Sequence, residues 1–280
     1  MKLKNKFYER IMAMLCWGAA LSSVSALLFI VGFILVKGLP HIKPSLFSVA
    51  YSSDNVSLMP ALVSTIIMTF MSILLAVPLG MFAAIYLVEY AGRGTLRANK
   101  AVMFIRITAE TLSGIPSIVY GLFGLLFFVT FLDWKFSMLA GAFTLAIMIL
   151  PLIMRSSEEA LLAVPDMYRE GAFGLGAGKL RTVFRIVLPS AMPGILAGII
   201  LATGRIVGET AALVYTAGTV AQIPKNPMQS ARTLSVHMYA LSGEGLHVNE
   251  GYATAVVLLV MVIILNIASA KSAKKLAGGA

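Results

Sequence analysis

The sequence predicts an all-α, polytopic membrane protein with six transmembrane helices. Hydrophobic residues make up 59% of its 280 residues, only 12% are charged, and the mean hydropathy is +0.91. A soluble domain carries about a quarter charged residues, so this composition disfavours a water-soluble enzyme or nucleic-acid-binding domain. The single cysteine, Cys16, excludes an internal disulfide and a paired-cysteine metal site.

Six long runs without charged side chains supply the predicted helices. A bilayer core about 30 Å thick needs around 20 apolar residues at a rise of 1.5 Å per residue. The runs cover residues 11–36, 59–88, 111–132 and 136–154, a fifth run that begins after Arg185 and extends towards Thr216, and residues 251–270. Pro78 is expected to kink the second helix.

Lysine and arginine positions orient the chain. Most of the 22 lie in residues 1–10, 89–110, 155–189 and 271–280, which share one side of the membrane in a six-span topology. Cytoplasmic loops carry an excess of these residues, so both termini are expected to be cytoplasmic. The formal net charge of +10 is then largely a topology signal, and no basic face of a soluble module suggests a nucleic-acid partner.

The predicted cytoplasmic loop 155–189 is too long for a simple helix connection, which usually takes about 2–8 residues. Ser156 and the glutamates after it favour the start of a short helix that stops before Pro165. Asp166 then opens a second helix that continues to Phe173. A generic basic loop would satisfy the same charge bias, so the residue pattern has to distinguish the two interpretations.

That pattern is specific. Glu170-Gly171-Ala172 is followed after three residues by Gly176, and nine residues later by Ile186-x-Leu188-Pro189. The spacing resembles the EAA loop of ABC importer permeases, with Gly171 in place of the usual central alanine. The resemblance implies a type-1 importer permease architecture, in which this loop forms a coupling helix against a separate ATP-binding subunit. The residues expected to make or shape that contact are Glu170, Gly171, Ala172, Phe173, Gly176, Ile186, Leu188 and Pro189.

The chain itself shows no nucleotide site and no catalytic residues. Gly178-Lys179 is similar to the end of a P-loop, but Leu180 stands where serine or threonine is required. We therefore expect no metal or other cofactor in this chain, and ATP and Mg²⁺ to be used by the partner subunit.

Arg205 and Glu209 lie within the fifth predicted span, four residues apart and therefore on one helical face within pairing reach. Charged groups at membrane depth cost about 3 kcal/mol or more and usually face the bundle interior or an aqueous pathway. A guanidinium can replace water around an oxyanion such as phosphate or sulfate. We expect Glu209 to orient Arg205 and Thr210 to add a contact; an ion pair that only fixes helix packing is the alternative.

Arg106 and Glu110 repeat this spacing near the cytoplasmic end of the third span. Here the favoured interpretation is an ion pair that orients the helix end at the membrane surface. Gly114-Ile115-Pro116 follows and is expected to interrupt the helix. Broken backbone at membrane depth is tolerated where it lines a cavity, so Pro116 is a candidate gate residue.

Three further stretches, residues 110–121, 204–211 and 233–239, resemble phosphate ABC importer permeases of the PstA type rather than the PstC type. The likeness covers most of residues 59–270 and implies a permease core there, after a first helix and outer loop (1–58) and before a cytoplasmic tail (271–280). It implies phosphate import across a bacterial inner membrane. The partners it implies are a PstC-type permease, two PstB-type ATP-binding subunits, a PstS-type extracytoplasmic phosphate-binding protein and membrane lipid.

Two other functions remain open. The protein could be a permease for sulfate, molybdate or amino acids. Such a permease would also have the EAA loop, but Arg205 would then not serve phosphate transport. An ATP-independent transporter would make the loop coincidental. An intramembrane enzyme has no support, because the sequence shows no paired catalytic carboxylates and no nucleophile–base set.

Overall fold

The computed structural model describes residues 2–91 and 96–277, and this part of the chain contains helices and no strands. The α-helices are α1 (Lys2–Gly38), α2 (Met59–Ile85), α3 (Leu96–Ser113), α4 (Ser117–Gly124), α5 (Met138–Leu162), α6 (Asp166–Gly174), α7 (Lys179–Thr182), α8 (Leu188–Gly208), α9 (Ala211–Val214), α10 (Leu234–Glu244) and α11 (Val248–Ala277). Two 3-10 turns, η1 (Leu39–His41) and η2 (Pro44–Phe47), and three π-helical segments, η3 (Tyr86–Ala91), η4 (Leu125–Phe131) and η5 (Val183–Val187), extend or join them.

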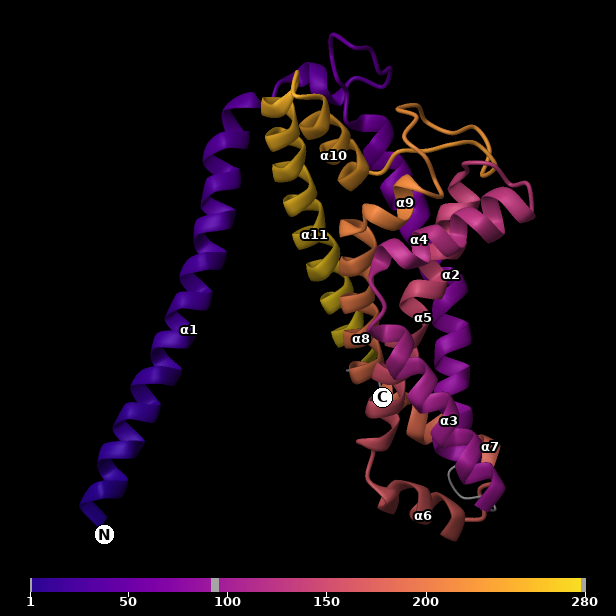
Figure 1. The fold of residues 1–280 in the computed structure, drawn as a ribbon. Coiled ribbons are helices and arrows are strands. Elements are labelled where there is room, and N and C mark those ends of the chain that lie inside the picture. Colours follow the sequence, from indigo (N-terminus) through magenta and orange to yellow (C-terminus); the bar gives the residue numbers. More distant parts are fainter. Residues whose placement is uncertain (1, 92–95, 278–280) are drawn as a thin grey trace.

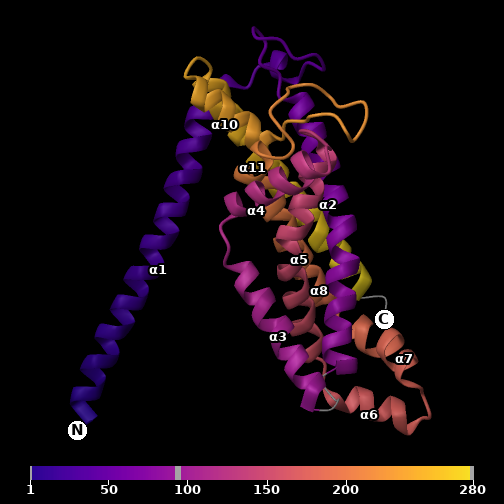
Figure 2. The ribbon, with the colours of Figure 1, turned by 45° about the vertical axis from the view of Figure 1, so that its right-hand side comes forward.

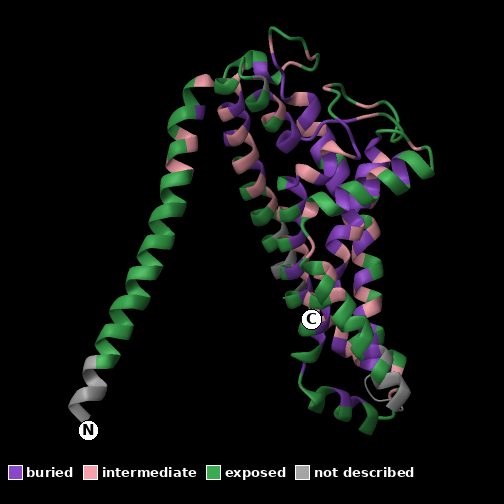
Figure 3. Cartoon of the chain, viewed as in Figure 1, coloured by how far each residue is buried: buried purple, intermediate pink, exposed green. Residues whose placement is uncertain are grey.

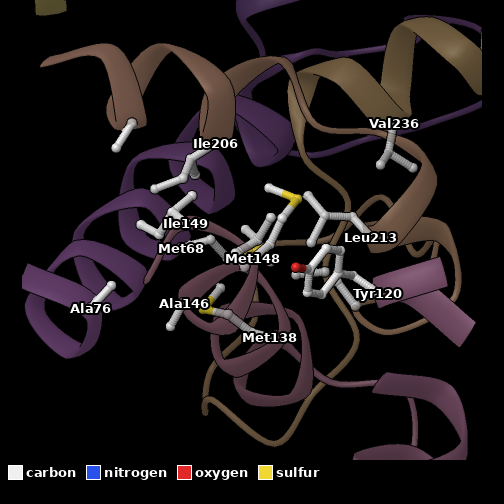
Figure 4. Packing of buried hydrophobic residues seen from close by; sticks show 14 of the residues in the cluster. Met68, Ala76, Tyr120, Met138, Ala146, Met148, Ile149, Ile206, Leu213 and Val236 are labelled. Carbon is white, nitrogen blue, oxygen red and sulfur yellow. The ribbon is translucent and has the colours of Figure 1, made fainter. Parts of the chain in front are cut away.

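Helices α2, α5, α8 and α11 form the body of the protein (Figure 1). α5 packs against α2 and α8, and α8 packs against α11. Met68, Leu145 and Ile149 are buried in the core that these helices share, and Tyr120 of α4 belongs to the same cluster (Figure 4). Gly80 allows α2 to approach α5, since a Cβ atom there would lie 2.9 Å from Cγ2 of Ile153.

Helix α1 stands apart from the bundle (Figures 1 and 2), and its described side chains are exposed along most of its length (Figure 3). It meets α11 near its C-terminal end, where the rings of Phe33 and Tyr252 pack edge to face at 5.8 Å between centroids. The N-terminal end of α1 lies at the same end of the molecule as α6 (Figure 1), which the predicted topology requires. The division of the chain at residues 58 and 270 stays a prediction, and residues 278–280 of the expected tail lie outside the described residues.

The third span is broken where the sequence predicts. Val102–Ser113 and Ser117–Phe131 are bent by 99° across Gly114-Ile115-Pro116. The Tyr120 hydroxyl donates to the Leu112 carbonyl at 2.8 Å and so joins the two halves across the break. The first half begins at Leu96, well before the predicted start at Thr111, because Arg106 and Glu110 pair with residues of α5 and do not end the helix.

The structure has five helices long and apolar enough to cross a membrane, and a sixth span if the bent pair is counted as one. The prediction of an all-α six-span protein is confirmed in this sense. Besides the start of α3, two helix boundaries differ from prediction. α5 continues through Ser156, whose hydroxyl donates to the Ile153 carbonyl at 3.1 Å, so no new helix begins there. α8 ends at Gly208 and does not extend towards Thr216.

Candidate functional site

Helix α6 contains the first part of the predicted coupling motif and lies at the end of the bundle, away from α10 (Figure 1). Pro165 precedes its first turn, and Asp166 places a negative charge at the helix N-terminus, where it is favourable. Glu170 and Gly171 are exposed, whereas Ala172 is buried. Gly176 adopts φ +81°, a left-handed conformation that glycine tolerates best, and the chain turns away from α6 there.

The exposed face of α6 is strongly apolar. Met167 is 72% exposed and Leu175, which follows the helix, is 91% exposed, and Tyr168 and Phe173 are also exposed. Apolar side chains gathered at one exposed site commonly mark a binding surface. The prediction included Phe173 but missed Met167, Tyr168 and Leu175, because apolar side chains that face a partner look the same in the sequence as those that pack against the bundle.

The second part of the motif lies apart from this face. Ile186 lies in η5, and Leu188 and Pro189 lie in the first turn of α8. All three residues are half-buried. Their neighbours Val183 and Val187 are buried in a cluster with Leu161 and Val164. Ile186, Leu188 and Pro189 therefore hold the returning chain against the bundle, while Glu170, Gly171 and Phe173 lie at the exposed tip.

A buried ion pair fixes the inner side of α6. Arg169 donates to Oε1 of Glu89 from Nε at 3.0 Å and from Nη2 at 2.7 Å, and both side chains are 5% exposed. The sequence does not predict this pair. Glu89 ends the uncharged run of the second span, and it lies 80 positions before Arg169, so no local spacing indicates the contact.

Arg205 lies exposed on α8 and lines a hollow of about 600 Å³. The hollow is formed by α8, by Leu152 of α5 and by Asn266 of α11, and Arg205 and Asn266 are its polar side chains. No described carboxylate lies within ion-pair distance of Arg205. An unpaired guanidinium at this depth is therefore available to an anion. Asn266 was not predicted, because a single asparagine in an apolar helix has no distinctive spacing.

The predicted pairing of Arg205 with Glu209 is wrong. α8 ends at Gly208, and Glu209 has extended backbone (ψ 127°), so the i,i+4 geometry of a continuous helix does not reach it. The buried Glu209 carboxylate instead accepts from the Ala212 backbone N–H at 3.1 Å. Its carbonyl accepts from the Ser235 hydroxyl at 2.6 Å. Thr210 is half-buried and lies at the start of α9 rather than in the hollow, so Arg205 alone of the three lines it.

The predicted pair between Arg106 and Glu110 is also not formed. Arg106 pairs with Glu158, and Glu110 pairs with Arg155 at 3.8 Å. Both partners belong to α5. Helix α3 packs beside α5, so Arg106 and Glu110 pair with opposite charges across the α3–α5 interface and not with each other. These charges line a hollow of about 250 Å³ near the cytoplasmic end predicted for the bundle. Pro116 begins α4 at the helix break, as described above, and its role as a gate residue stays a prediction.

Within the described residues, no three His, Cys, Asp or Glu side chains form a group that could hold a metal ion. The candidate functional residues form three separate features along the bundle. They are an exposed apolar helix at one end, a charged α3–α5 interface beside it, and an unpaired arginine in a hollow farther along α8.

Comparison with known proteins identifies the family. Residues 56–276 match the family model of the binding-protein-dependent transport system inner membrane component. The probable ABC transporter permease protein YqgI of Bacillus subtilis is 36% identical over 217 residues, 71% of this chain and 72% of that protein. The phosphate transport system permease protein PstA of Haemophilus influenzae is 30% identical over 267 residues, 94% of this chain and 93% of that protein.

A solved structure shares the fold. The chain resembles a subunit of a bacterial alginate ABC transporter, solved in complex with a periplasmic protein bound to an alginate pentasaccharide. The TM-score is 0.68 at 13% identity, with 94% of this chain and 95% of the other covered. The family model spans most of the chain and includes the coupling loop, α8 and α11. The protein therefore belongs to the family of inner membrane components of binding-protein-dependent transport systems.

Proposed function

We propose that this protein is a permease subunit of an ATP-driven importer of inorganic phosphate. The observation that carries the proposal is Arg205, an exposed guanidinium without a described carboxylate partner in a hollow between transmembrane helices. A guanidinium offers a planar fork of donors that matches two oxygens of a phosphate. The relative from Haemophilus influenzae, which is named as a phosphate permease and aligns with nearly the whole chain, supports this substrate.

Arg205 would attract phosphate and coordinate it transiently, with the Asn266 amide as an additional donor. A single unpaired arginine in a wide hollow would bind phosphate weakly. Weak binding favours transport, because a tight phosphate site within the pathway would slow release. Selectivity would then lie mainly in an extracytoplasmic phosphate-binding protein of the PstS type. Broken helix α3–α4 would form part of the gate, with Pro116 at the bend.

Energy would come from two ATP-binding subunits of the PstB type, which use ATP and Mg²⁺, and one of them would dock on the exposed face of α6. A homologous PstC-type permease would complete the pathway. The apolar surface of α1, exposed along most of its length, is compatible with burial against that partner or against lipid. The protein would lie in a bacterial inner membrane with both termini, α6 and the α3–α5 charges on the cytoplasmic side.

Uptake of labelled phosphate tests the substrate. Cells lacking this subunit are complemented with wild type, Arg205→Gln or Lys37→Gln, with excess sulfate or molybdate as competitor. Lys37 is an exposed cation in the last turn of α1, so its loss controls for removal of one positive charge outside the hollow. We expect wild type and Lys37→Gln to restore sulfate-resistant uptake and Arg205→Gln to assemble but fail. If excess sulfate or molybdate inhibits the uptake of labelled phosphate, that oxyanion would be the substrate of the same hollow.

Docking of the ATP-binding subunit is tested by co-purification. Glu170→Lys reverses a charge on the exposed side of α6 without altering a buried residue, and we expect it to release the ATP-binding subunit from the detergent-purified complex. Asp133→Lys makes the same reversal at an exposed position at the opposite end of the molecule and should release nothing. Retention of the ATP-binding subunit by Glu170→Lys would contradict the assignment of α6 as the coupling helix.

A further inference from the structure

The guanidinium of Arg169 lies at the junction of α6, the end of α5 and segment η3. Besides its two bonds to Glu89, Nη2 donates to the Leu161 carbonyl at 3.0 Å. Nη1 donates to the Val164 carbonyl at 2.7 Å and to Asp166 at 3.2 Å. A guanidinium has five N–H donors, and these contacts use all of them. The side chain therefore satisfies the free carbonyls at the C-terminus of α5 and an acid on another helix at once.

This contact demands arginine in particular. A lysine ammonium has three donors and no planar fork, so it cannot serve two carbonyls and two carboxylates together. Burial also makes the pair interdependent: removing one partner of a buried ion pair leaves an uncompensated charge in a low-dielectric site. Glu89 and Arg169 consequently hold η3 and α6 together, while the rest of α6 packs mainly against η5 and α7.

Glu89 is placed to transmit movement. Segment η3 continues α2, and Met59–Ala91 forms a single apolar helical stretch of 33 residues. α2 packs along α5, and its Met68 belongs to the same buried cluster as Tyr120 of the broken third span (Figure 4). A displacement of α6 would therefore reach the core and the helix break through a rigid element attached at Glu89. A π-helical segment at this attachment fits a functional position, since such segments are frequent at functional sites.

We propose that the Arg169–Glu89 pair is the positioning link through which displacement of the coupling helix moves α2. The proposal rests on the proposed function, because it assumes that an ATP-binding subunit pushes on α6. A pair that merely stabilised the fold would affect assembly and thermal stability, but not the amount of substrate imported per ATP hydrolysed.

The test uses the complete transporter reconstituted in proteoliposomes, with uptake and ATP hydrolysis measured together. We expect Glu89→Gln and Arg169→Lys to retain ATP hydrolysis, while uptake per ATP falls at least tenfold. The double variant should be no worse than either single variant, because both disrupt one link. Asp166→Asn is the matched control: it alters an acid that contacts the same guanidinium but is 71% exposed and belongs to α6 itself. Its uptake per ATP should stay within twofold of wild type.

A covalent replacement keeps the proposal testable if these variants assemble poorly. In a Cys16→Ser background, Glu89→Cys and Arg169→Cys are joined by a short flexible bis-methanethiosulfonate cross-linker, with each cysteine thiolate displacing one methanesulfinate. Uptake per ATP should be low in the free dithiol and recover on linking. Wild-type uptake per ATP in assembled Glu89→Gln, or failure of the linked protein to transport, would overturn the proposal. If wild type carries sulfate instead of phosphate, the proposed substrate fails, but the same ratios measured with sulfate still test the link.

Discussion

Substitution of Glu209 separates the observed contact from the predicted ion pair. In the structure the carboxylate accepts a hydrogen bond from the Ala212 N–H in buried surroundings. Glu209→Ala leaves that N–H without a partner, which costs about 1–3 kcal/mol. Glu209→Gln keeps an amide oxygen in the same place and loses only the charge-assisted part, about 1 kcal/mol or less. At about 2–4 °C per kcal/mol for a chain of this size class, the alanine variant should melt about 2–12 °C below wild type.

The assay is thermal unfolding of the detergent-purified complex at a fixed scan rate, because membrane complexes seldom unfold reversibly. The glutamine variant should melt closer to wild type than the alanine variant does. Arg205→Gln should leave the melting temperature within about 1 °C, since Arg205 has no described acidic partner to lose. If Glu209 were the counter-ion of Arg205, glutamine and alanine would destabilise alike, and Arg205→Gln would destabilise as well. That pattern would refute the capping assignment.

Three other changes have expected outcomes. Burial, then the charge of Arg232, lowers the pKa of His237 in α10 from 6.5 to about 3. Since the unfolded chain binds this proton below pH 6.5 and the folded protein does not, stability should fall by about 2 kcal/mol from pH 6.5 to 5. His237→Gln should remove that slope in thermal unfolding, and an unchanged slope would contradict it. Gly198→Leu should abolish assembly, judged by gel filtration, because a Cβ there collides with Ser156, whereas normal assembly would contradict the α5–α8 packing. Asn266→Ala should lower the initial rate of phosphate uptake about two- to fivefold, and unchanged uptake would place the pathway elsewhere.

The sequence predicts the fold class well because burial in a bilayer is a property of long segments. Runs without charge identify the spans, and the Gly114-Ile115-Pro116 break follows from the backbone chemistry of glycine and proline. Both signals are local, so no knowledge of neighbouring helices is needed. The coupling motif is likewise contained in a stretch of 20 residues, of which the structure exposes the first part on α6 and packs the second part against the bundle.

Side-chain partners could not be predicted in the same way. The i,i+4 rule identifies neighbours on a continuous helix, and it failed for Glu209 because α8 ends one residue earlier. It failed for Arg106 and Glu110 because α5 supplies counter-ions across a helix interface. The Glu89–Arg169 contact spans 80 residues, and only the three-dimensional packing brings its partners together. Charged residues near span ends are therefore poor boundary markers when a neighbouring helix can neutralise them.

Because Glu209 does not pair with Arg205, the guanidinium can bind an anion without first breaking an ion pair. A guanidinium already paired with a carboxylate would have to exchange that bond for phosphate, and the net gain on binding would be small. An unpaired guanidinium makes its full interaction with the anion, about 1.5–3 kcal/mol for hydrogen bonds to a charged group. One such contact corresponds to binding far weaker than 1 mM, for which about 4.1 kcal/mol is needed. Arg205 by itself therefore favours passage of an anion without trapping it, and tight recognition requires donors from another protein.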